Sequence, residues 1–271
     1  MNALSIDLED WFCAHNLSCV IKQEDWDKCE LRVRESTARL LQLLENHGLR
    51  ATFFVLGWLA EKAPDLVKKI EKASHEIACH TYSHLLLTET TPEAFEEDLK
   101  KALQALDRCG VEDVVGFRAP SFTLVKGTEW VLGILEKYGF RYDSSVFPVG
   151  FHPDYGMAEA PLAPYPITDR IMEFPLSCFE LWGKRIPVCG GAYFRLFPYW
   201  FTRWGIKRCN SKGRPVVFYV HPWEIDPGQP RVKLPRFKYF RHYYNLKKTE
   251  GKLEVLFRDF KFTTIREVLG L

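Results

Sequence analysis

The sequence predicts an α/β fold organised around a parallel sheet, and three observations support this prediction. The first 85 residues alternate between short β-prone runs and segments whose apolar residues have helical spacing, which is the pattern of βαβ units. Charged residues and histidines directly follow several predicted strands, where parallel sheets gather their functional groups. A later run rich in β-branched and aromatic residues, 215–220, predicts another buried strand.

The composition is that of an ordinary globular protein. Hydrophobic residues make up 46% of the 271 residues and charged residues 27%, which is enough to build a large core. No internal repeat or linker divides the chain, so we expect a single domain over residues 1–271. The net charge of +2 does not indicate a nucleic acid or an anionic membrane as partner. An aromatic content of 14% suits a cleft that stacks sugar rings, and it suits a large core equally well.

The sequence shows no targeting signal and no disulfide framework. There is no basic and apolar leader at the start and no run long enough to span a bilayer, so a soluble cytoplasmic protein is expected. The eight cysteines are irregularly spaced and form no C-x-x-C pair. This pattern favours free thiols in a reducing compartment over a structural zinc ribbon. The oligomeric state is left open.

Elements in the first part of the chain follow one another regularly. They are expected in the order strand 3–6, loop insertion 12–30, helix 32–47, strand 51–56, helix 64–73 and strand 76–79. Gly48 closes the first helix, and Pro64 suits the first turn of the second. Thr91 and Pro92 then provide a cap and a first position for a long helix that ends near Arg108.

The second part of the chain is less regular. The remaining elements are expected as strand 114–117, helix 128–138, strand-to-loop junction 140–145, loop 146–172, strand 172–176, flexible loop 190–195, helix 199–209, strand 215–220, helix 253–260 and strand 262–264. The segment 228–251 is basic, aromatic and without a clear period. We expect it to be a solvated rim loop, although its cations could contact an anionic ligand.

An acidic cluster follows the first predicted strand. Asp7, Glu9 and Asp10 place three carboxylates within four residues, which is unfavourable unless a cation or hydrogen bonds compensate. The period of two in a strand puts Asp7 and Glu9 on the same side, whereas Asp10 points elsewhere unless the strand has already turned. One carboxylate could bind a metal and another act as a base. The alternative is a solvated loop with capping acids.

His80 and His84 are the centre of the functional interpretation. On one helical turn, residues four apart lie on the same face, so both imidazoles could bind one ion. Two surface histidines are the alternative. Because Asp7, Glu9 and His80 all fall at the ends of predicted parallel strands, we expect them to meet in space.

Arg118 and His221 also follow predicted strands. Arg118 precedes a stiff loop that contains Pro120, and it could hold a catalytic carboxylate ionised or form a salt bridge at the rim. His221 ends the strand 215–220 and could be a site residue or a core histidine bonded to a carbonyl. Gly190 and Gly191 do not form a phosphate-binding loop, because no G-x-G-x-x-G or G-K-[ST] pattern follows them.

Taken together, these junctions resemble the polysaccharide deacetylases of the carbohydrate esterase family 4 type. The motifs occur in the family's order: His80-Thr81-Tyr82-Ser83-His84, Arg118-Ala119-Pro120-Ser121-Phe122 and Tyr219-Val220-His221-Pro222-Trp223. The runs 51–55 and Tyr142-Asp143-Ser144-Ser145 are also similar to the family. The likeness extends over nearly the whole chain.

The first motif departs from the family pattern. The family usually has Thr-Phe-Asp-Asp-Gly, whereas this chain has Ser5-Ile6-Asp7-Leu8-Glu9-Asp10-Trp11. It looks like the subgroup with an Asp-x-Glu first motif, linked to bacterial exopolysaccharide loci and to peptidoglycan deacetylase relatives. Glu173-Phe174-Pro175 and the segment 190–195 resemble the same subgroup. The resemblance maps Asp7 to the base and Glu9 to the metal ligand, with Asp10 as a rival ligand.

The resemblance implies a distorted, seven-stranded (β/α) barrel that removes N-acetyl groups from an amino-sugar glycan. It implies a divalent metal ion, zinc above others, bound by His80, His84 and either Glu9 or Asp10. Asp7 would be the base, Arg118 would keep Asp7 charged, and His221 would protonate the leaving amine. The substrate contacts implied are Pro120, Tyr142, Asp143 and Trp223, with an oxyanion donor among the backbone N–H groups near Asp143.

Two other functions stay open. An allantoinase-like cyclic amide hydrolase would use the same metal chemistry. A catalytically inactive carbohydrate-binding module would keep the barrel without turnover, although the acid, base and ligand residue types are all present.

Overall fold

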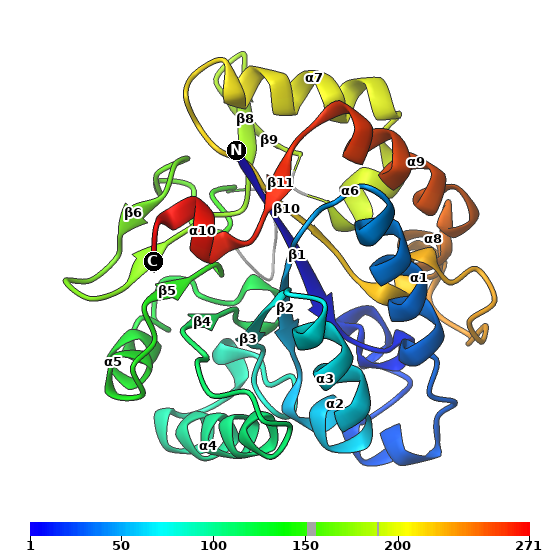
Figure 1. Cartoon of the computed structure of the whole chain (residues 1–271), viewed down its shortest axis with the longest axis vertical. Helices are drawn as coiled ribbons and strands as arrows, with labels where there is room; N and C mark the ends of the chain where they lie inside the picture. Colours follow the sequence, from blue (N-terminus) through cyan, green and yellow to red (C-terminus); the bar gives the residue numbers. More distant parts are fainter. Residues whose placement is uncertain (151–155, 189) are drawn as a thin grey trace.

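A mostly parallel sheet lies at the centre of the computed structural model, which describes residues 1–150, 156–188 and 190–271 (Figure 1). Within this part of the chain the sheet has nine strands in the order β10-β1-β2-β3-β4-β5-β7-β6, with β11 beside β1. The strands are β1 (Asn2–Leu8), β2 (Thr52–Val55), β3 (Glu76–Cys79), β4 (Gly116–Phe117), β5 (Tyr142–Asp143), β6 (Tyr165–Pro166), β7 (Met172–Glu173), β10 (Val217–Val220) and β11 (Phe262–Thr263).

The pairing of the strands confirms the expected α/β fold and distorted barrel. The path from β10 to β7 contains seven strands that pair in parallel. The short strand β6 extends this path in the antiparallel direction, and β11 pairs with the start of β1. The sheet is therefore a curled barrel wall of seven parallel strands with two short additions, of which β11 corresponds to the expected strand 262–264.

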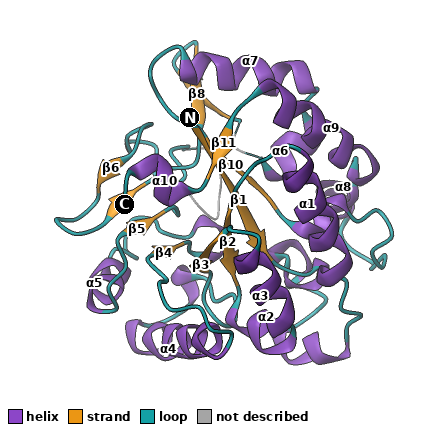
Figure 2. Cartoon of the chain, in the orientation of Figure 1, coloured by secondary structure: helices purple, strands orange, loops and turns teal. Residues whose placement is uncertain are grey.

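Helices surround the sheet on its outer side, as Figure 2 shows. They are α1 (Val33–Asn46), α2 (Gly57–Lys62), α3 (Pro64–Lys72), α4 (Pro92–Arg108), α5 (Trp130–Lys137), α6 (Gly191–Leu196), α7 (Tyr199–Asn210), α8 (Arg236–Tyr243), α9 (Leu246–Asp259) and α10 (Ile265–Leu269). Short 3-10 helices connect them: η1 (Trp11–Cys13), η2 (His15–Leu17), η3 (Gln23–Lys28), η4 (Leu87–Glu89), η5 (Pro120–Phe122) and η6 (Pro222–Ile225). Among the described residues, none of the helices combines the length and apolarity needed to cross a bilayer.

Elements with a strong local signal lie where they were expected. The strand β3 has the expected bounds, and α4 begins at Pro92 after the cap Thr91, whose hydroxyl accepts a hydrogen bond from the N–H of Ala94. The helix α1 ends shortly before Gly48, which adopts a positive φ of 61°. Each of these elements combines apolar periodicity with a capping residue, so the sequence alone was sufficient to locate it.

The structure differs from the sequence-based expectation mainly after residue 176. The expected loop 190–195 forms most of α6, and the segment 228–251 contains α8 and the first part of α9. The hairpin of β8 (Cys178–Leu181) and β9 (Lys184–Pro187) was not expected either, and neither was α2. The β8–β9 hairpin and α8 expose aromatic and basic residues on their outer faces, which hide the apolar period. The expected loop 146–172 also includes residues 151–155, which lie outside the described residues.

Candidate metal and catalytic site

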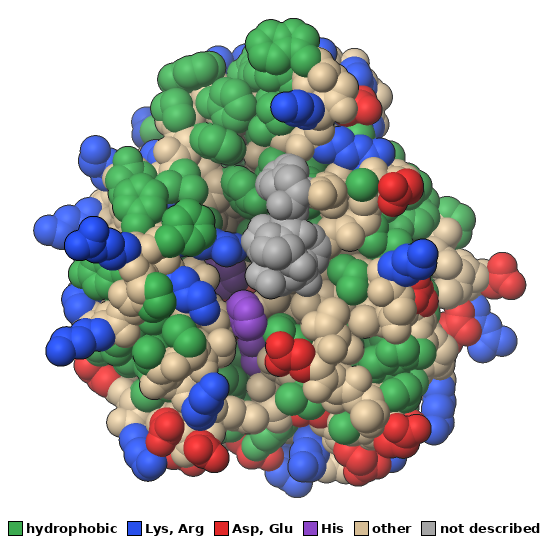
Figure 3. All heavy atoms as spheres, turned by 180° about the vertical axis from the view of Figure 1, so that it is seen from behind, with side chains coloured by type: hydrophobic (Ala, Val, Ile, Leu, Met, Phe, Trp, Pro, Cys, Tyr) green, Lys and Arg blue, Asp and Glu red, His purple; other side chains and the backbone are tan. Residues whose placement is uncertain are grey.

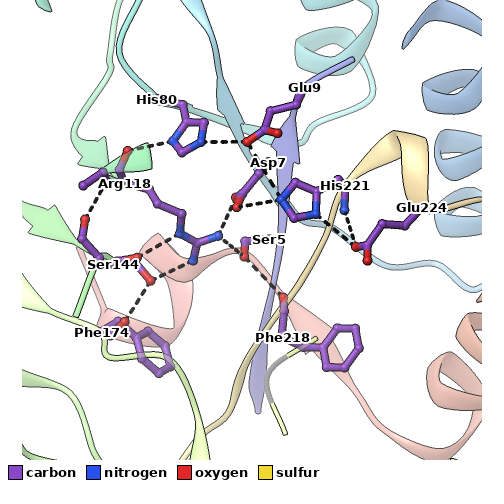
Figure 4. Close-up of polar contacts among 12 residues, drawn as sticks. Ser5, Asp7, Glu9, His80, Arg118, Ser144, Phe174, Phe218, His221 and Glu224 are labelled. Carbon is purple, nitrogen blue, oxygen red and sulfur yellow. Dashed lines mark hydrogen bonds and ion pairs between the residues drawn. The ribbon is translucent and has the colours of Figure 1, made fainter. Parts of the chain in front are cut away.

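The carboxyl ends of β1, β3, β4 and β10 bring the predicted site residues together (Figure 4). Asp7 lies near the end of β1 and Glu9 just beyond it, while His80 follows β3 and His221 follows β10. These strands run parallel in one sheet, so their carboxyl ends lie at one rim of the barrel. A pocket of about 110 Å³ opens there, and Asp7, Glu9, His84 and His221 line it.

Glu9 and two histidines form a buried cluster with the donor set of a metal site. The Oε1 atom of Glu9 lies 3.2 Å from Nε2 of His80 and 3.1 Å from Nε2 of His84. The three ligand atoms all lie within 4.8 Å of one another. Two imidazoles and one carboxylate are a common ligand set for catalytic zinc.

The hydrogen bonding of His80 shows why a cation fits between these groups. The Nδ1 atom of His80 lies 2.7 Å from the carbonyl oxygen of Arg118, which can only accept, so we place the proton on Nδ1. The other ring nitrogen, Nε2, faces the carboxylate of Glu9. A distance of 3.2 Å between Nε2 and Oε1 leaves room for a proton or a shared cation between these two atoms. The residues present therefore fit a divalent ion.

The charge state of Glu9 also suits a ligand. Burial by itself raises the pKa of this carboxyl, but the neighbouring His84 and His221 outweigh burial and hold the pKa well below its usual value. Glu9 is only 3% exposed. An ionised and nearly inaccessible carboxylate between imidazoles is preorganised to bind a cation.

The segment from His80 to His84 is a loop and does not form the helical turn that was expected. Thr81 and His84 adopt positive φ values of 63° and 57°, which end any regular helix. Asp98 on α4 holds the loop by accepting hydrogen bonds from the backbone N–H groups of Tyr82 (2.7 Å) and Ser83 (3.1 Å). The two imidazoles converge because the loop folds back on itself, and their ring centroids lie 5.3 Å apart.

Asp10 is not brought into the cluster around Glu9. Its carboxylate accepts hydrogen bonds from the backbone N–H groups of Trp11 (2.7 Å), Arg32 (2.7 Å) and Val33 (2.8 Å). It thus caps η1 and holds the start of α1, which is the capping role considered as the alternative for this acidic segment. Burial raises the pKa of Asp10 to about 6 despite these hydrogen bonds.

Arg118 holds Asp7 in a fixed orientation. Its Nη1 atom donates to Oδ1 of Asp7 at 2.6 Å and to the hydroxyl of Ser5 at 2.8 Å. Its Nε and Nη2 atoms donate to the carbonyl oxygen and the hydroxyl of Ser144. The guanidinium is fully buried and lies 4.1 Å from the ring centroid of Phe54. All these contacts leave Oδ2 of Asp7 directed toward the pocket.

His221 lies across the pocket from the two carboxylates of β1. Its Nε2 atom is 3.8 Å from Oδ2 of Asp7 and 3.9 Å from Oε1 of Glu9. On the other side of the ring, Nδ1 lies 3.1 Å from Oε2 of Glu224. Burial alone would lower the pKa of His221, but the carboxylates of Glu9, Glu224 and Asp7 raise it to about 9. His221 can therefore carry a proton into the pocket at neutral pH.

Glu224 and Arg195 are site residues that sequence reasoning did not assign. Oε2 of Glu224 also accepts the backbone N–H of His221, and Oε1 accepts a hydrogen bond of 2.6 Å from Nε of Arg195. The pKa of Glu224 falls to about 2, because the charges of Arg195 and His221 outweigh its burial. A glutamate three residues after His221 and followed by a turn is a capping-box signal that could have identified it.

The predicted substrate contacts divide into two groups. Trp223 lines the pocket and stacks on His221, with ring centroids 5.0 Å apart. Pro120 directly precedes Ser121, which also lines the pocket. Tyr142 points toward the other end of the sheet, where its hydroxyl donates to Glu76 at the start of β3. The structure therefore does not support a direct substrate contact by Tyr142.

Asp143 is buried beneath the rim and does not line the pocket. Its carboxylate accepts hydrogen bonds from the backbone N–H and the hydroxyl of Ser145. The N–H of Ser144 donates to the carbonyl oxygen of Phe117 at 3.0 Å. Because both N–H groups already have acceptors within the protein, the structure does not support the oxyanion donor expected near Asp143.

Comparisons with known proteins agree with this geometry. Residues 25–142 match the family model "Polysaccharide deacetylase", and residues 144–270 match a "Domain of unknown function (DUF3473)". A peptidoglycan-N-acetylglucosamine deacetylase of Bacillus cereus is 39% identical over 74 residues, which cover 27% of this chain and only 27% of that relative.

Solved structures support the fold. One from Mycobacterium smegmatis, assigned to the polysaccharide deacetylases, has a TM-score of 0.62 at 19% identity and covers 99% of this chain and 89% of its own. A CE4 family pseudoenzyme from Bacillus anthracis has a TM-score of 0.53 at 14% identity and covers 99% and 65%. At these identities the likeness establishes the fold alone.

Proposed function

We propose, from the premise that residues 25–142 belong to the polysaccharide deacetylase family, that this chain is a metal-dependent hydrolase. It removes N-acetyl groups from an amino-sugar-containing glycan. The observation that carries the proposal is the convergence of the Glu9–His80–His84 cluster, the Asp7–Arg118 pair and His221 at one pocket. The N-acetylglucosamine substrate of the Bacillus cereus relative supports this class of substrate.

Glu9, His80 and His84 would hold the ion, and Zn²⁺ suits their nitrogen and oxygen donors best. A bound divalent ion supplies Lewis acidity toward the amide carbonyl and lowers the pKa of water. We assign the carboxylate ligand to Glu9 because the oxygens of Asp10 are occupied by backbone N–H groups.

The remaining residues have complementary roles in proton transfer. Asp7 accepts a proton from the attacking water through Oδ2, while Arg118 keeps its other oxygen fixed. His221 donates the proton on Nε2 to the leaving amine, because its raised pKa keeps it protonated at neutral pH. Trp223 packs on the ring of His221 and limits its movement. Tyr142 and Asp143 are left out of the proposed substrate contacts.

The two matched regions act as one catalytic unit in this proposal. Asp7 and Glu9 precede the first matched region, whereas His221 and Glu224 lie in the second, and the ends of β1 and β10 bring them together. Neither matched region contains a complete site by itself. This supports one catalytic domain over residues 1–271.

The assignment of the ligands is tested by comparing Glu9→Gln with Asp10→Asn. Both changes remove one carboxylate charge from neighbouring positions, so each is the control for the other. We expect Glu9→Gln, like His80→Ala, to lose more than about a hundredfold in zinc affinity and to release no acetate from N-acetylglucosamine oligomers. Asp10→Asn keeps its metal and loses stability. Equal metal content in Glu9→Gln and the wild type would contradict the assignment.

The same assay separates the alternative functions. Hydrolysis of a ureide without release of acetate would support the cyclic amide hydrolase. The inactive binding module would be supported if the wild-type protein binds oligosaccharide but does not bind zinc and does not turn over substrate. Acetate release that depends on zinc and on Glu9 supports the deacetylase.

A further inference from the structure

The charge of the chain is strongly segregated along the sequence. The net charge is only +2, yet residues 181–249 contain fifteen Lys and Arg residues and two acidic residues, Glu224 and Asp226. Both acidic side chains are buried and paired, Glu224 with Arg195 and Asp226 with Arg32. The acidic residues Glu180 and Asp259 lie beside this segment and pair with Lys212 and Arg203, so the segment presents an excess of cations that the overall net charge does not indicate.

The same segment exposes aromatic side chains. All the exposed large aromatic residues that the structure describes lie between residues 182 and 244. Trp182 is 92% exposed, Trp200 67% and Phe237 75%. Figure 3 shows hydrophobic side chains gathered at the top and the left of one face, with a histidine in the hollow beside them. Exposed apolar groups concentrated in this way indicate an interaction surface.

Helix α7 combines both properties on its outer face. Trp200, Trp204, Lys207 and Arg208 are exposed there, whereas Thr202, Ile206 and Cys209 face the core. The guanidinium of Arg208 lies 5.9 Å from the ring centroid of Trp204. The helix packs on the β8–β9 hairpin, since the rings of Trp204 and Phe179 lie 5.0 Å apart.

Trp182 stands at the tip of this hairpin, between β8 and β9 and two residues before Lys184. It adopts a positive φ of 48°, and its ring is almost entirely in solvent. An indole ring in this position can insert into the headgroup region of a lipid bilayer. A ring that stacks a sugar usually lines a hollow, as Trp223 does in the catalytic pocket.

We propose that the basic aromatic surface, formed by Trp182, Trp200, Trp204, Lys207 and Arg208, docks on an anionic lipid bilayer. Indole rings favour the headgroup region, and the long stems of Lys and Arg can lie along it while their charges meet anionic lipids. Each basic residue near an anionic bilayer contributes to the binding free energy, and insertion of aromatic rings adds to it. The chain would then act on glycan held close to a membrane.

Vesicle binding of the full-length protein tests this proposal. Sedimentation with phosphatidylcholine vesicles that contain phosphatidylglycerol is expected, and sedimentation with phosphatidylcholine alone is not. Lys207→Glu with Arg208→Glu should weaken binding at least about tenfold. Lys68→Glu with Lys69→Glu makes the same change of charge on the exposed side of α3 and should leave binding unchanged. Trp182→Ala with Trp200→Ala should also weaken binding, because aromatic insertion is lost.

Several results would overturn the proposal. These are no binding to anionic vesicles, equal weakening by the α3 changes, or binding to a soluble acidic polysaccharide in place of vesicles. Acetate release from soluble oligomers should be unchanged in the Trp182→Ala, Trp200→Ala protein. If the wild-type protein turns over substrate but does not bind vesicles, the membrane proposal is rejected and the proposed activity stands. If the wild-type protein binds vesicles but releases no acetate, only the proposed activity is rejected.

Discussion

Glu224 connects the proposed acid His221 to a buried cation. One oxygen accepts both the backbone N–H and the ring Nδ1–H of His221, and the other accepts from Arg195. Arg195 is in turn fixed by the carbonyl oxygens of His242 and Tyr244. A chain of charge-assisted hydrogen bonds therefore sets which nitrogen of His221 faces the pocket.

Replacing Glu224 by Gln should lower kcat by about 10–100-fold with little change in KM. The single amide oxygen cannot serve both Arg195 and His221, so the ring loses its fixed orientation while the pocket keeps its shape. Steady-state kinetics with N-acetylglucosamine oligomers measures the effect, and circular dichroism checks folding. Glu254→Gln, an exposed change on α9, serves as the control. An unchanged kcat would show that Glu224 does not position His221.

Most of the site residues could be predicted from strand ends in the sequence. Asp7, His80, Arg118 and His221 each directly follow or end a β-prone run, and the parallel sheet places such positions at one rim. Arg195 could not be predicted, because its partner Glu224 lies 29 residues later and its own segment has no local helix signal. The direction of Tyr142 depends on which face of a two-residue strand it occupies.

At the scale of elements, α4 supports the loop that carries the two histidines. Asp98 lies on the buried face of this helix and accepts the N–H groups of Tyr82 and Ser83. The loop has left-handed residues at Thr81 and His84, and the carbonyl oxygens of Thr81 and Tyr82 accept hydrogen bonds from the first two N–H groups of α2. Asp98 is the acceptor for the N–H groups of Tyr82 and Ser83, which precede His84.

Asp98→Ala should weaken zinc binding by about 10–100-fold, although Asp98 does not touch the ion. Without its carboxylate the two N–H groups lose their acceptor, and His84 no longer stays beside Glu9. Asp107→Ala removes an exposed carboxylate from the same helix and should leave the zinc affinity unchanged. Isothermal titration calorimetry with zinc compares the proteins. Equal affinities would show that the loop holds its shape without α4.

Local signals explain which elements the sequence predicted. The helices α1 and α4 have both an apolar stripe and an end signal, so their positions followed from spacing. In α8 the buried residues are only His242 and Tyr243, and the exposed face carries further aromatic residues. A helix whose outer face is also apolar has no contrast between faces, so no helical period can be recognised in it.

At the scale of the whole molecule, acid stability depends on a buried neutral histidine. His242 is fully buried, stacks on Trp223 at a centroid distance of 4.5 Å, and lies 2.9 Å from Oε1 of Gln229. Burial lowers its pKa from 6.5 to about 3. The unfolded chain therefore binds a proton in the pH range in which the folded protein does not.

This difference in proton binding lowers the free energy of unfolding at acidic pH. The stabilisation is fully present above pH 6.5 and is lost as the pH falls toward the folded pKa of about 3. His242→Gln should reduce the slope of unfolding free energy against pH by about 1.4 kcal/mol per pH unit in this range. Urea unfolding at several pH values measures both slopes. Parallel curves for the two proteins would show that His242 is protonated in the folded state.

The position of β1 has a consequence for how the protein is made. This strand lies inside the sheet, between β2 on one side and β10 and β11 on the other, yet Asn2 and Val216, which hydrogen-bond to each other, are 214 residues apart. At about 5–20 residues per second, β1 waits roughly 10–40 s after its own synthesis for the partners on one side. The nascent chain therefore carries an unpaired, aggregation-prone strand edge during this interval, and it should depend on chaperones until β10 and β11 emerge.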